Sequence, residues 1–550
     1  MEGVQTIEFQ YNDNLRTSAK EGFMKTDVKV KERHIVLAVI LLTAVVMVGV
    51  LATPSWTAEP KPRYGGTMRM SDYIDGTFIG YPPKIVRSFA NRQAAPAIET
   101  LLRMDKAGKT IPWLATATKE NAAAKTLTLT LRKNVKFHDD TDFNADAVKW
   151  NLEQHMAAKA PGTERFQSID AVDNYTVRIN LNQWDSTVTS NLSQTLGMII
   201  SPTAVKKNGV DWATTHPTGT GPFQFVSWEK DTRTVYKKFP GYWQKGKPYL
   251  DEIVWTPIAD SLVRLLSIRK GEVDLILSVA PKDLADLEKE GFIVKRPCIG
   301  SGATALVPDS ANPKSPFADI RVRQAAQHAI DADAIVKGIF HSEWEVANQW
   351  IYKGHWGYNA SIAKYPYDPA KAKQLLAAAG YPSGFKTKLT YRTSVEWDQT
   401  FTAVQGYLKA IGIDAELDPI QSGKYDQLAL QGGRWDGLLV NMVSPNPDVT
   451  AALSQIYSGG GKYFTQMLLP DDYVSAIQKA LSASDFKTKQ KWTQEALKLM
   501  ADKYRLQIFL LARRDFAVSR PALHNHGIAE TPSTGQWTPE DAWVEISSGK

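Results

Sequence analysis

Residues 35–52 (IVLAVILLTAVVMVGVLA) form an apolar run of 18 residues without a charged side chain. As an α-helix this run would be about 27 Å long, at 1.5 Å per residue, which is just enough to cross the hydrocarbon core of a bilayer. It has no polar face, so it does not fit a helix at the surface of a globular core. The sequence therefore predicts a segment that enters the membrane.

The charges before the run set its orientation. Lys25, Lys29, Lys31 and Arg33 precede it, so the positive-inside rule places residues 1–34 in the cytoplasm and the body outside. Val50-Leu51-Ala52 passes as a small-residue cleavage signal, but a 34-residue leader is long for a signal peptide. We favour an uncleaved transmembrane anchor over a cleaved signal segment, with residues 53–63, rich in proline, as a linker.

The composition excludes several classes of protein. The chain has 550 residues, enough for several domains, and 43% of them are hydrophobic, as in a globular protein. The net charge of +7 is spread along the chain, whereas a nucleic-acid reader concentrates basic residues in a patch, so no nucleic-acid partner is expected. The single cysteine, Cys298, excludes internal disulfides and cysteine-based metal clusters.

Hydrophobic periodicity predicts mixed α/β layers. Leu127, Leu129 and Leu131 alternate with threonines, which indicates a half-buried antiparallel strand over 125–138. Further along the chain, predicted helices alternate with strands, which is typical of α/β layers. The other predicted strands cover 65–73, 175–181, 252–256, 388–392, 414–419 and 437–442, and the helices cover 144–155, 261–270, 282–290, 320–339, 369–379 and 400–411.

A search for catalytic and metal-binding motifs finds none with the required spacing. The cluster of His138, Asp139, Asp140 and Asp142 contains cation ligands, but a turn between a strand and a helix explains it better. His524 and His526 have strand spacing and lack visible partner ligands. We therefore expect no catalytic residues, no bound metal ion and no cofactor.

From Tyr64 to about Gly527 the order of motifs resembles the extracytoplasmic solute-binding proteins of peptide- and nickel-type ABC importers, the oligopeptide- and dipeptide-binding family. The motifs can also be explained by local structure. Asp368-Pro369, for example, suits a helix N-cap followed by proline at the first helical position. The matching blocks are GGTMRM (65–70), 111–150, PTGTGPFQFVSWEKD (217–231), GYWQKGKPYLDEIVW (241–255), RKGEVDLI (269–276), 315–336, YDPAKAKQLLAAAGYPSG (367–384) and LKAIGIDAEL (408–417).

The resemblance implies an α/β, periplasmic-binding-protein-like fold of two lobes that close over a ligand, with an extra subdomain in the first lobe. Lobe one would comprise 64–85, 218–280 and 507–550, the extra subdomain 86–217, and lobe two 281–506. The resemblance also implies a monomer at the extracytoplasmic side of the cell membrane whose partners are an ABC permease, an ATPase and a peptide or other small polar solute.

The ligand-binding stretch departs from the family pattern. Peptide binders of this kind grip the α-amino group of the peptide with a carboxylate shortly after a tryptophan on a lobe-two strand. Here Met442 stands at the tryptophan position and Pro445 at that of the acid, so the anchor is missing unless Asp448 replaces it. The ligand-binding residues that the family cleft implies are Arg87, Phe89, Ser278, Asn348, Trp350, Asn441, Ser444 and Asn446.

Three functions are compatible with these features. The leading hypothesis is a solute receptor of an ABC importer, without chemistry of its own. A ligand-sensing receptor without an importer and a membrane-anchored hydrolase that uses the cleft are the alternatives, and no acid/base pair supports the hydrolase.

Overall fold

The computed structural model describes residues 61–85, 88–296, 302–442, 446–459, 462–533 and 535–545. The described residues from Pro62 onwards belong to one compact unit. The predicted membrane segment 35–52 lies outside the described residues. Within the described part of the chain, no helix combines the length and apolarity needed to span a bilayer.

The first large sheet has seven strands in the order β12-β19-β11-β1-β10-β9-β8. β1 runs parallel to both of its neighbours, and the outer pairs are antiparallel. Met68 and Met70 of β1 are fully buried, which confirms the first predicted strand. The strands are β1 (Thr67–Asp72), β8 (Phe223–Glu229), β9 (Arg233–Lys238), β10 (Glu252–Pro257), β11 (Leu275–Leu277), β12 (Ile293–Lys295) and β19 (Ala517–Ser519), and α7 (Ser261–Lys270) and α8 (Pro281–Lys289) connect β10, β11 and β12.

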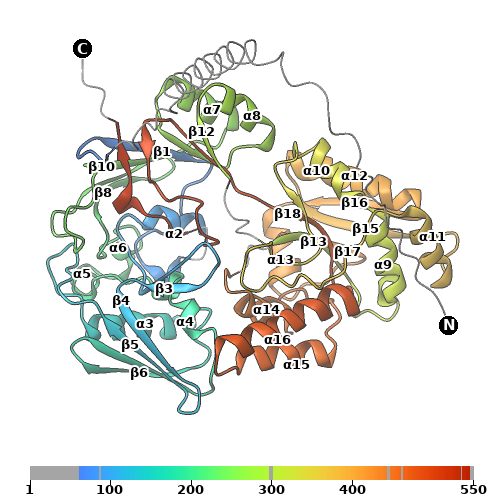
Figure 1. Cartoon of the computed structure of the whole chain (residues 1–550), viewed down its shortest axis with the longest axis horizontal. Coiled ribbons are helices and arrows are strands. Elements are labelled where there is room, and N and C mark those ends of the chain that lie inside the picture. Colours follow the sequence, from blue (N-terminus) through green and yellow to red (C-terminus); the bar gives the residue numbers. More distant parts are fainter. Residues whose placement is uncertain are drawn as a thin grey trace, which may run out of the picture. The chain divides into compact units, whose positions relative to one another are not determined.

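The second large sheet has six strands in the order β14-β18-β13-β17-β15-β16 (Figure 1). Its strands are β13 (Ala303–Pro308), β14 (Glu345–Val346), β15 (Phe385–Arg392), β16 (Ile413–Ile420), β17 (Leu438–Asn441) and β18 (Ile508–Ala512). Helices cover both faces of this sheet. Successive side chains of β13 point to opposite faces, and Leu306 belongs to one apolar cluster whereas its neighbours Ala305 and Val307 belong to another. The first cluster includes α9 (Ile320–Ala329), α10 (Ala332–Gly338), α11 (Pro369–Ala378) and α12 (Val395–Ala410), and the second includes α13 (Ser422–Leu430), α14 (Val449–Tyr457), α15 (Asp471–Leu481) and α16 (Phe486–Lys498).

A four-stranded antiparallel sheet, β4-β5-β7-β6, lies within the predicted extra subdomain. Leu127, Leu129 and Leu131 of β5 are 0–2% exposed, as their alternation with threonine predicts. The Asn144 side chain accepts a hydrogen bond from the Ala147 amide and caps α3. The elements are β4 (Ala115–Asn121), β5 (Thr126–Leu131), β6 (Phe166–Asp173), β7 (Thr176–Leu181) and α3 (Ala145–Ala157), and smaller elements nearby are α2 (Ser88–Ala94), β2 (Leu102–Met104), β3 (Thr110–Pro112), α4 (Val188–Asn191), α5 (Pro202–Asn208) and α6 (Val210–Ala213).

Two predicted helices have different bounds in the structure. The helix expected over 320–339 is divided at Ile330, and the Asp331 carboxylate caps α10 by accepting a 2.9 Å hydrogen bond from the Ala334 amide. α12 begins at Val395, before the predicted start at 400, because Ser394 supplies the N-cap. The predicted Asp368 cap of α11 is confirmed by its 2.9 Å hydrogen bond from Lys371.

The chain passes between the two large sheets after β12 and again after β18. β12 pairs with β19 of the first sheet, so residues 281–296 continue lobe one and the first crossing is not at 281. β18 belongs to the second sheet, so the second crossing follows Ala512 rather than residue 506. The predicted lobe boundaries came from the family resemblance, which does not assign the short strand β12 or the entirely buried β18 to a sheet.

Candidate functional site

A polar cluster lies where β1 and β11 end. Asp72, the last residue of β1, is 1% exposed and accepts hydrogen bonds from Arg92 Nη1 at 3.1 Å and from Ser278 Oγ at 2.8 Å. Arg264 Nη2 donates to the Ser278 carbonyl oxygen at 3.1 Å. Ser278 has a φ of 54°. A positive φ is uncommon for residues other than glycine, and residues with such strained backbone angles are found more often at functional sites. The carboxyl ends of parallel strands are the usual position of ligands in α/β sheets.

An ion pair occupies the second crossing, between β18 and β19. Arg513 Nη2 donates to Asp515 Oδ1 at 2.9 Å, and about a third of each side chain is exposed. Burial opposes ionisation of Asp515, but the guanidinium groups of Arg513 and Arg92 outweigh it and hold the pKa of Asp515 below its usual value. Asp515 and the Glu396 carboxylate, in the first turn of α12, raise the pKa of Arg513. Charged side chains of α2 and α12 therefore affect the ionisation of this pair.

Four of the predicted ligand-binding residues have other contacts in the structure. Asn441 is 1% exposed, and its Nδ2 donates to the Tyr457 hydroxyl and, at 3.3 Å, to Gln507 Oε1. Trp350 is also 1% exposed and packs edge-on against Tyr457, with ring centroids 5.0 Å apart. Asn348 lines a cavity within lobe two, and Phe89 packs against the core of the first sheet.

Of the remaining predicted residues, Ser278 belongs to the polar cluster, and Arg87 and Ser444 lie outside the described residues. Asn446 connects lobe two with the extra subdomain, because its Nδ2 donates to Asn191 Oδ1 at 2.9 Å. The set of eight stays a prediction, and among the six of them that the structure describes, Ser278 is the one with a hydrogen bond to a charged side chain of this cluster.

Asp448, the one carboxylate that could replace the missing anchor, already holds a cation. Lys489 Nζ donates to Asp448 Oδ2 at 2.5 Å and to the Ser186 carbonyl oxygen at 2.9 Å. Burial opposes ionisation of Asp448, but the Lys489 ammonium keeps the pKa of the carboxyl below its usual value. Asp448 also caps α14 through the amides of Thr450 and Ala451. An internal lysine thus takes the position that a ligand ammonium would need.

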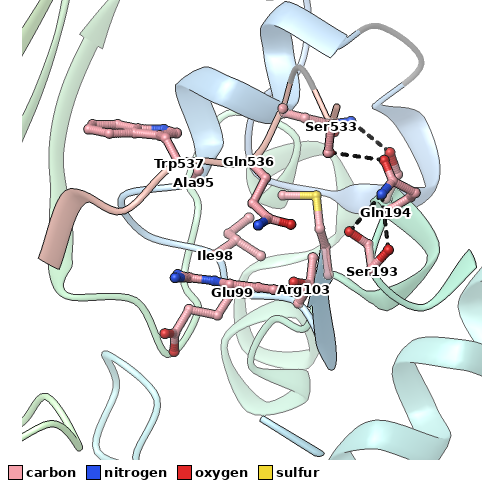
Figure 2. A pocket seen from close by; sticks show the side chains of 14 residues that line it. Ala95, Ile98, Glu99, Arg103, Ser193, Gln194, Ser533, Gln536 and Trp537 are labelled. Carbon is pink, nitrogen blue, oxygen red and sulfur yellow. Dashed lines mark hydrogen bonds between the residues drawn. The ribbon is translucent and has the colours of Figure 1, made fainter. Parts of the chain in front are cut away.

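A small pocket of about 40 Å³ lies between α2, Ser533 and residues 535–537 (Figure 2). One of its lining residues, Glu99, is 3% exposed and accepts hydrogen bonds from the indoles of Trp113 and Trp243 and from the hydroxyls of Tyr242 and Thr220. Arg103 beside it forms a buried ion pair with Glu540. The pocket has room for about three water molecules, which is too little for a solute, so we interpret it as a polar core of lobe one.

The candidate metal ligands have structural partners. Asp139 accepts hydrogen bonds from the Thr141 and Ser201 hydroxyls, both at 2.6 Å, and His138 Nε2 lies 2.9 Å from the Gly221 carbonyl oxygen. His524 Nε2 lies 3.0 Å from a Glu545 carboxylate oxygen, and His526 is 2% exposed. No group of three or more potential metal-ligating side chains occurs among the described residues.

Comparisons with known proteins agree with the two-sheet architecture. The model of bacterial extracellular solute-binding proteins, family 5 (middle), matches residues 109–464. The chain belongs to this family. Its members are binding proteins and not enzymes, which confirms that the chain is a peptide- and nickel-type solute-binding protein of the class that serves ABC importers, with its body outside the cytoplasm.

Two sequence relatives and one solved structure each match more than half of the chain. The glutathione-binding protein GsiB of Pectobacterium atrosepticum is 31% identical over 392 residues, which are 70% of this chain and 74% of that protein. GsiB of Salmonella typhimurium is 34% identical over 310 residues, 54% of this chain and 59% of that protein. The periplasmic binding protein DppA of Helicobacter pylori, solved with the peptide STSA, has a TM-score of 0.74 at 24% identity and covers 88% of this chain and 99% of its own.

Sequence reasoning missed the charged residues at the polar cluster and the second crossing. A signal was available for three of them, since Asp72 lies near the end of a predicted strand and Arg513 and Asp515 interrupt two apolar stretches. Arg92 and Arg264 carry no comparable signal, because an arginine on an amphipathic helix is usually an exposed surface residue.

Proposed function

We propose that this family 5 protein captures a peptide or another small polar solute between its lobes and delivers it to a membrane permease that an ATPase drives. The observation that carries the proposal is the family match over residues 109–464, together with two large sheets that only two crossings join. Such a connection permits hinge closure, in which a ligand binds the closed state better than the open one. We further propose that residues 35–52 anchor the monomer in the cell membrane.

Glutathione and its analogues are the first solutes to test, because the relatives named above include glutathione-binding proteins. The missing anchor and the Asp448–Lys489 pair favour a pose that does not depend on the α-amino group. An ammonium buried without an acceptor costs several kcal/mol, so the ligand would hold this group in water or not possess one.

The test is native mass spectrometry of freshly purified protein, followed by tryptophan fluorescence titration with the solute identified, with glutathione and with a tripeptide. We expect a small molecule to co-purify and the same molecule to change the fluorescence on rebinding. If no small molecule co-purifies and no member of a peptide panel alters fluorescence or raises the melting temperature, the receptor role is refuted. Asp72→Asn is the matched site variant, and Asp170→Asn on exposed β6 is its control.

A further inference from the structure

The extra subdomain contacts lobe two at a place far from both crossings in the sequence. The segment between β7 and α4 reaches the end of α15, where Trp184 Nε1 donates to the Ala483 carbonyl oxygen at 2.7 Å. The Ser186 amide and hydroxyl donate to the carbonyl oxygens of Leu481 and Ala480 at 2.7 and 2.8 Å. The last four carbonyls of a helix have no intrahelical donor, so this segment caps α15 from another part of the molecule.

α16 lies beside the extra subdomain (Figure 1), and its buried Lys489 makes a further bond to the same segment. Lys489 Nζ donates to the Ser186 carbonyl oxygen at 2.9 Å and forms its ion pair with Asp448. Both charged partners belong to lobe two, so the ion pair does not cross the boundary between lobe two and the extra subdomain. Separation of the two parts would therefore cost the ammonium one neutral acceptor, which water can replace, and would leave the charges paired.

Two more hydrogen bonds continue along this boundary. Asn446 Nδ2 donates to Asn191 Oδ1 at 2.9 Å, and the Trp356 amide donates to the Ala107 carbonyl oxygen at 3.3 Å. In each of the bonds named here the acceptor is a neutral oxygen, which exchanges a protein donor for water at a small net cost. These bonds add a non-covalent connection between the lobes to the two crossings of the polypeptide chain.

A cavity of about 360 Å³ lies against this boundary and is lined from both sides. Glu120, Thr189 and Ser190 line it from the extra subdomain, and Trp356 and Lys489 line it from lobe two. A permanent interface is normally packed as densely as a protein interior. Water in a polar cavity of this size can instead take over the hydrogen bonds when the two parts separate. The geometry is therefore that of a contact that can open.

We propose that Trp184, Ser186, Lys489 and the end of α15 form a clasp, which holds the two lobes together when no solute is bound and opens reversibly to admit one. The role in admission rests on the proposed function, whereas the clasp itself needs no ligand. A closed state that exists before a solute arrives reduces the cost of closure on binding, and the clasp sets how often that state opens.

Hydrogen exchange of the ligand-free full chain measures the clasp at one amide. The Ser186 amide donates to Leu481 across the boundary, so it should exchange about a hundredfold more slowly than an unstructured peptide. Trp184→Phe retains an aromatic ring but removes the indole donor, and the loss of one hydrogen bond should accelerate this exchange about fivefold. Trp228→Phe removes an indole bond to Asp75 within lobe one and should leave it unchanged. An unprotected Ser186 amide, or equal exchange in Trp184→Phe and wild type, would overturn the proposal.

A distance measurement distinguishes a reversible clasp from a permanent interface. Spin labels at Val172 of β6 and Lys498 of α16, both exposed, report the separation of the extra subdomain from lobe two by double electron–electron resonance in a Cys298→Ser background. The ligand-free protein with an intact clasp should show mainly one short distance, and Trp184→Phe with Ser186→Ala should add a longer one. A mainly long distance with the clasp intact, or an unchanged distribution in the double variant, would contradict the clasp. Neither result depends on a solute, so a failure of the receptor role stays distinguishable from a failure of the clasp.

Discussion

Removing the Lys489 ammonium should destabilise the fold far more than removing an exposed lysine. Asp448 and Lys489 are 3% and 6% exposed, and breaking a buried ion pair from one side typically costs about 3–5 kcal/mol of unfolding free energy. In Lys489→Met, Asp448 keeps the amides of Thr450 and Ala451 as donors, which reduces the loss. The bond to the Ser186 carbonyl also disappears, at about 1 kcal/mol. We expect a total loss of about 4 kcal/mol at pH 7.

Urea unfolding followed by tryptophan fluorescence measures this loss. The double variant Asp448→Asn with Lys489→Met should recover most of it, because asparagine is a good N-cap and carries no charge. Lys503→Met, which removes an exposed partner of Asp472, is the matched control and should behave as the wild type. If the single Lys489→Met variant loses less than about 1 kcal/mol, or the double variant is no more stable than the single, the buried pair does not stabilise the fold as argued here.

The pH dependence of the same variant provides an independent check. In the wild type the lowered pKa of Asp448 means that its contribution is present above the unfolded carboxyl pKa and is lost as pH falls through the folded one. Without Lys489, burial alone raises the Asp448 pKa, so protonation then favours the folded state. The difference between variant and wild type should therefore shrink from pH 7 towards about pH 4.

Three further predictions concern the ligand, the membrane and a buried histidine. Free and N-acetylated forms of a bound peptide should differ less than about tenfold in affinity, whereas a hundredfold loss on acetylation, about 2.7 kcal/mol, would show that an ammonium anchor exists. The full chain should sediment with membranes and resist high salt, while a protein beginning at Thr53 should be soluble, and full-length protein in the soluble fraction would contradict the anchor. Burial lowers the pKa of His526 to about 3, so its contribution to stability is complete above about pH 6.5 and falls as pH drops towards 3. By pH 5 this loss is about 2 kcal/mol, which His526→Asn should abolish in pH-dependent urea unfolding.

Local signals in the sequence were sufficient for most elements of the fold. The leucine and threonine alternation placed β5, and the caps Asn144 and Asp368 placed the starts of α3 and α11. The predictions failed where a boundary depends on tertiary contacts. Strand β12 is short and becomes recognisable only through its pairing with β19, and the division between α9 and α10 depends on the Asp331 cap within an otherwise helical pattern.

The candidate site was less accessible to sequence reasoning. The polar cluster joins Asp72, Arg92 and Ser278 over separations of 20 and 206 residues, and no local pattern contains such information. Asp448 shows the same limit, because the sequence could identify a spare carboxylate but could not show that Lys489, 41 positions later, neutralises it.

Both large sheets depend on the last part of the chain. β18 lies between β14 and β13, and β19 lies between β12 and β11, so residues 508–519 complete two sheets whose other strands begin at residues 67 and 303. A nascent chain that has not yet presented these residues leaves an unpaired gap in each sheet. The body therefore cannot reach its native state while it is being synthesised or while its end is still crossing the membrane. Residues 508–519 are therefore the stretch whose pairing completes both sheets.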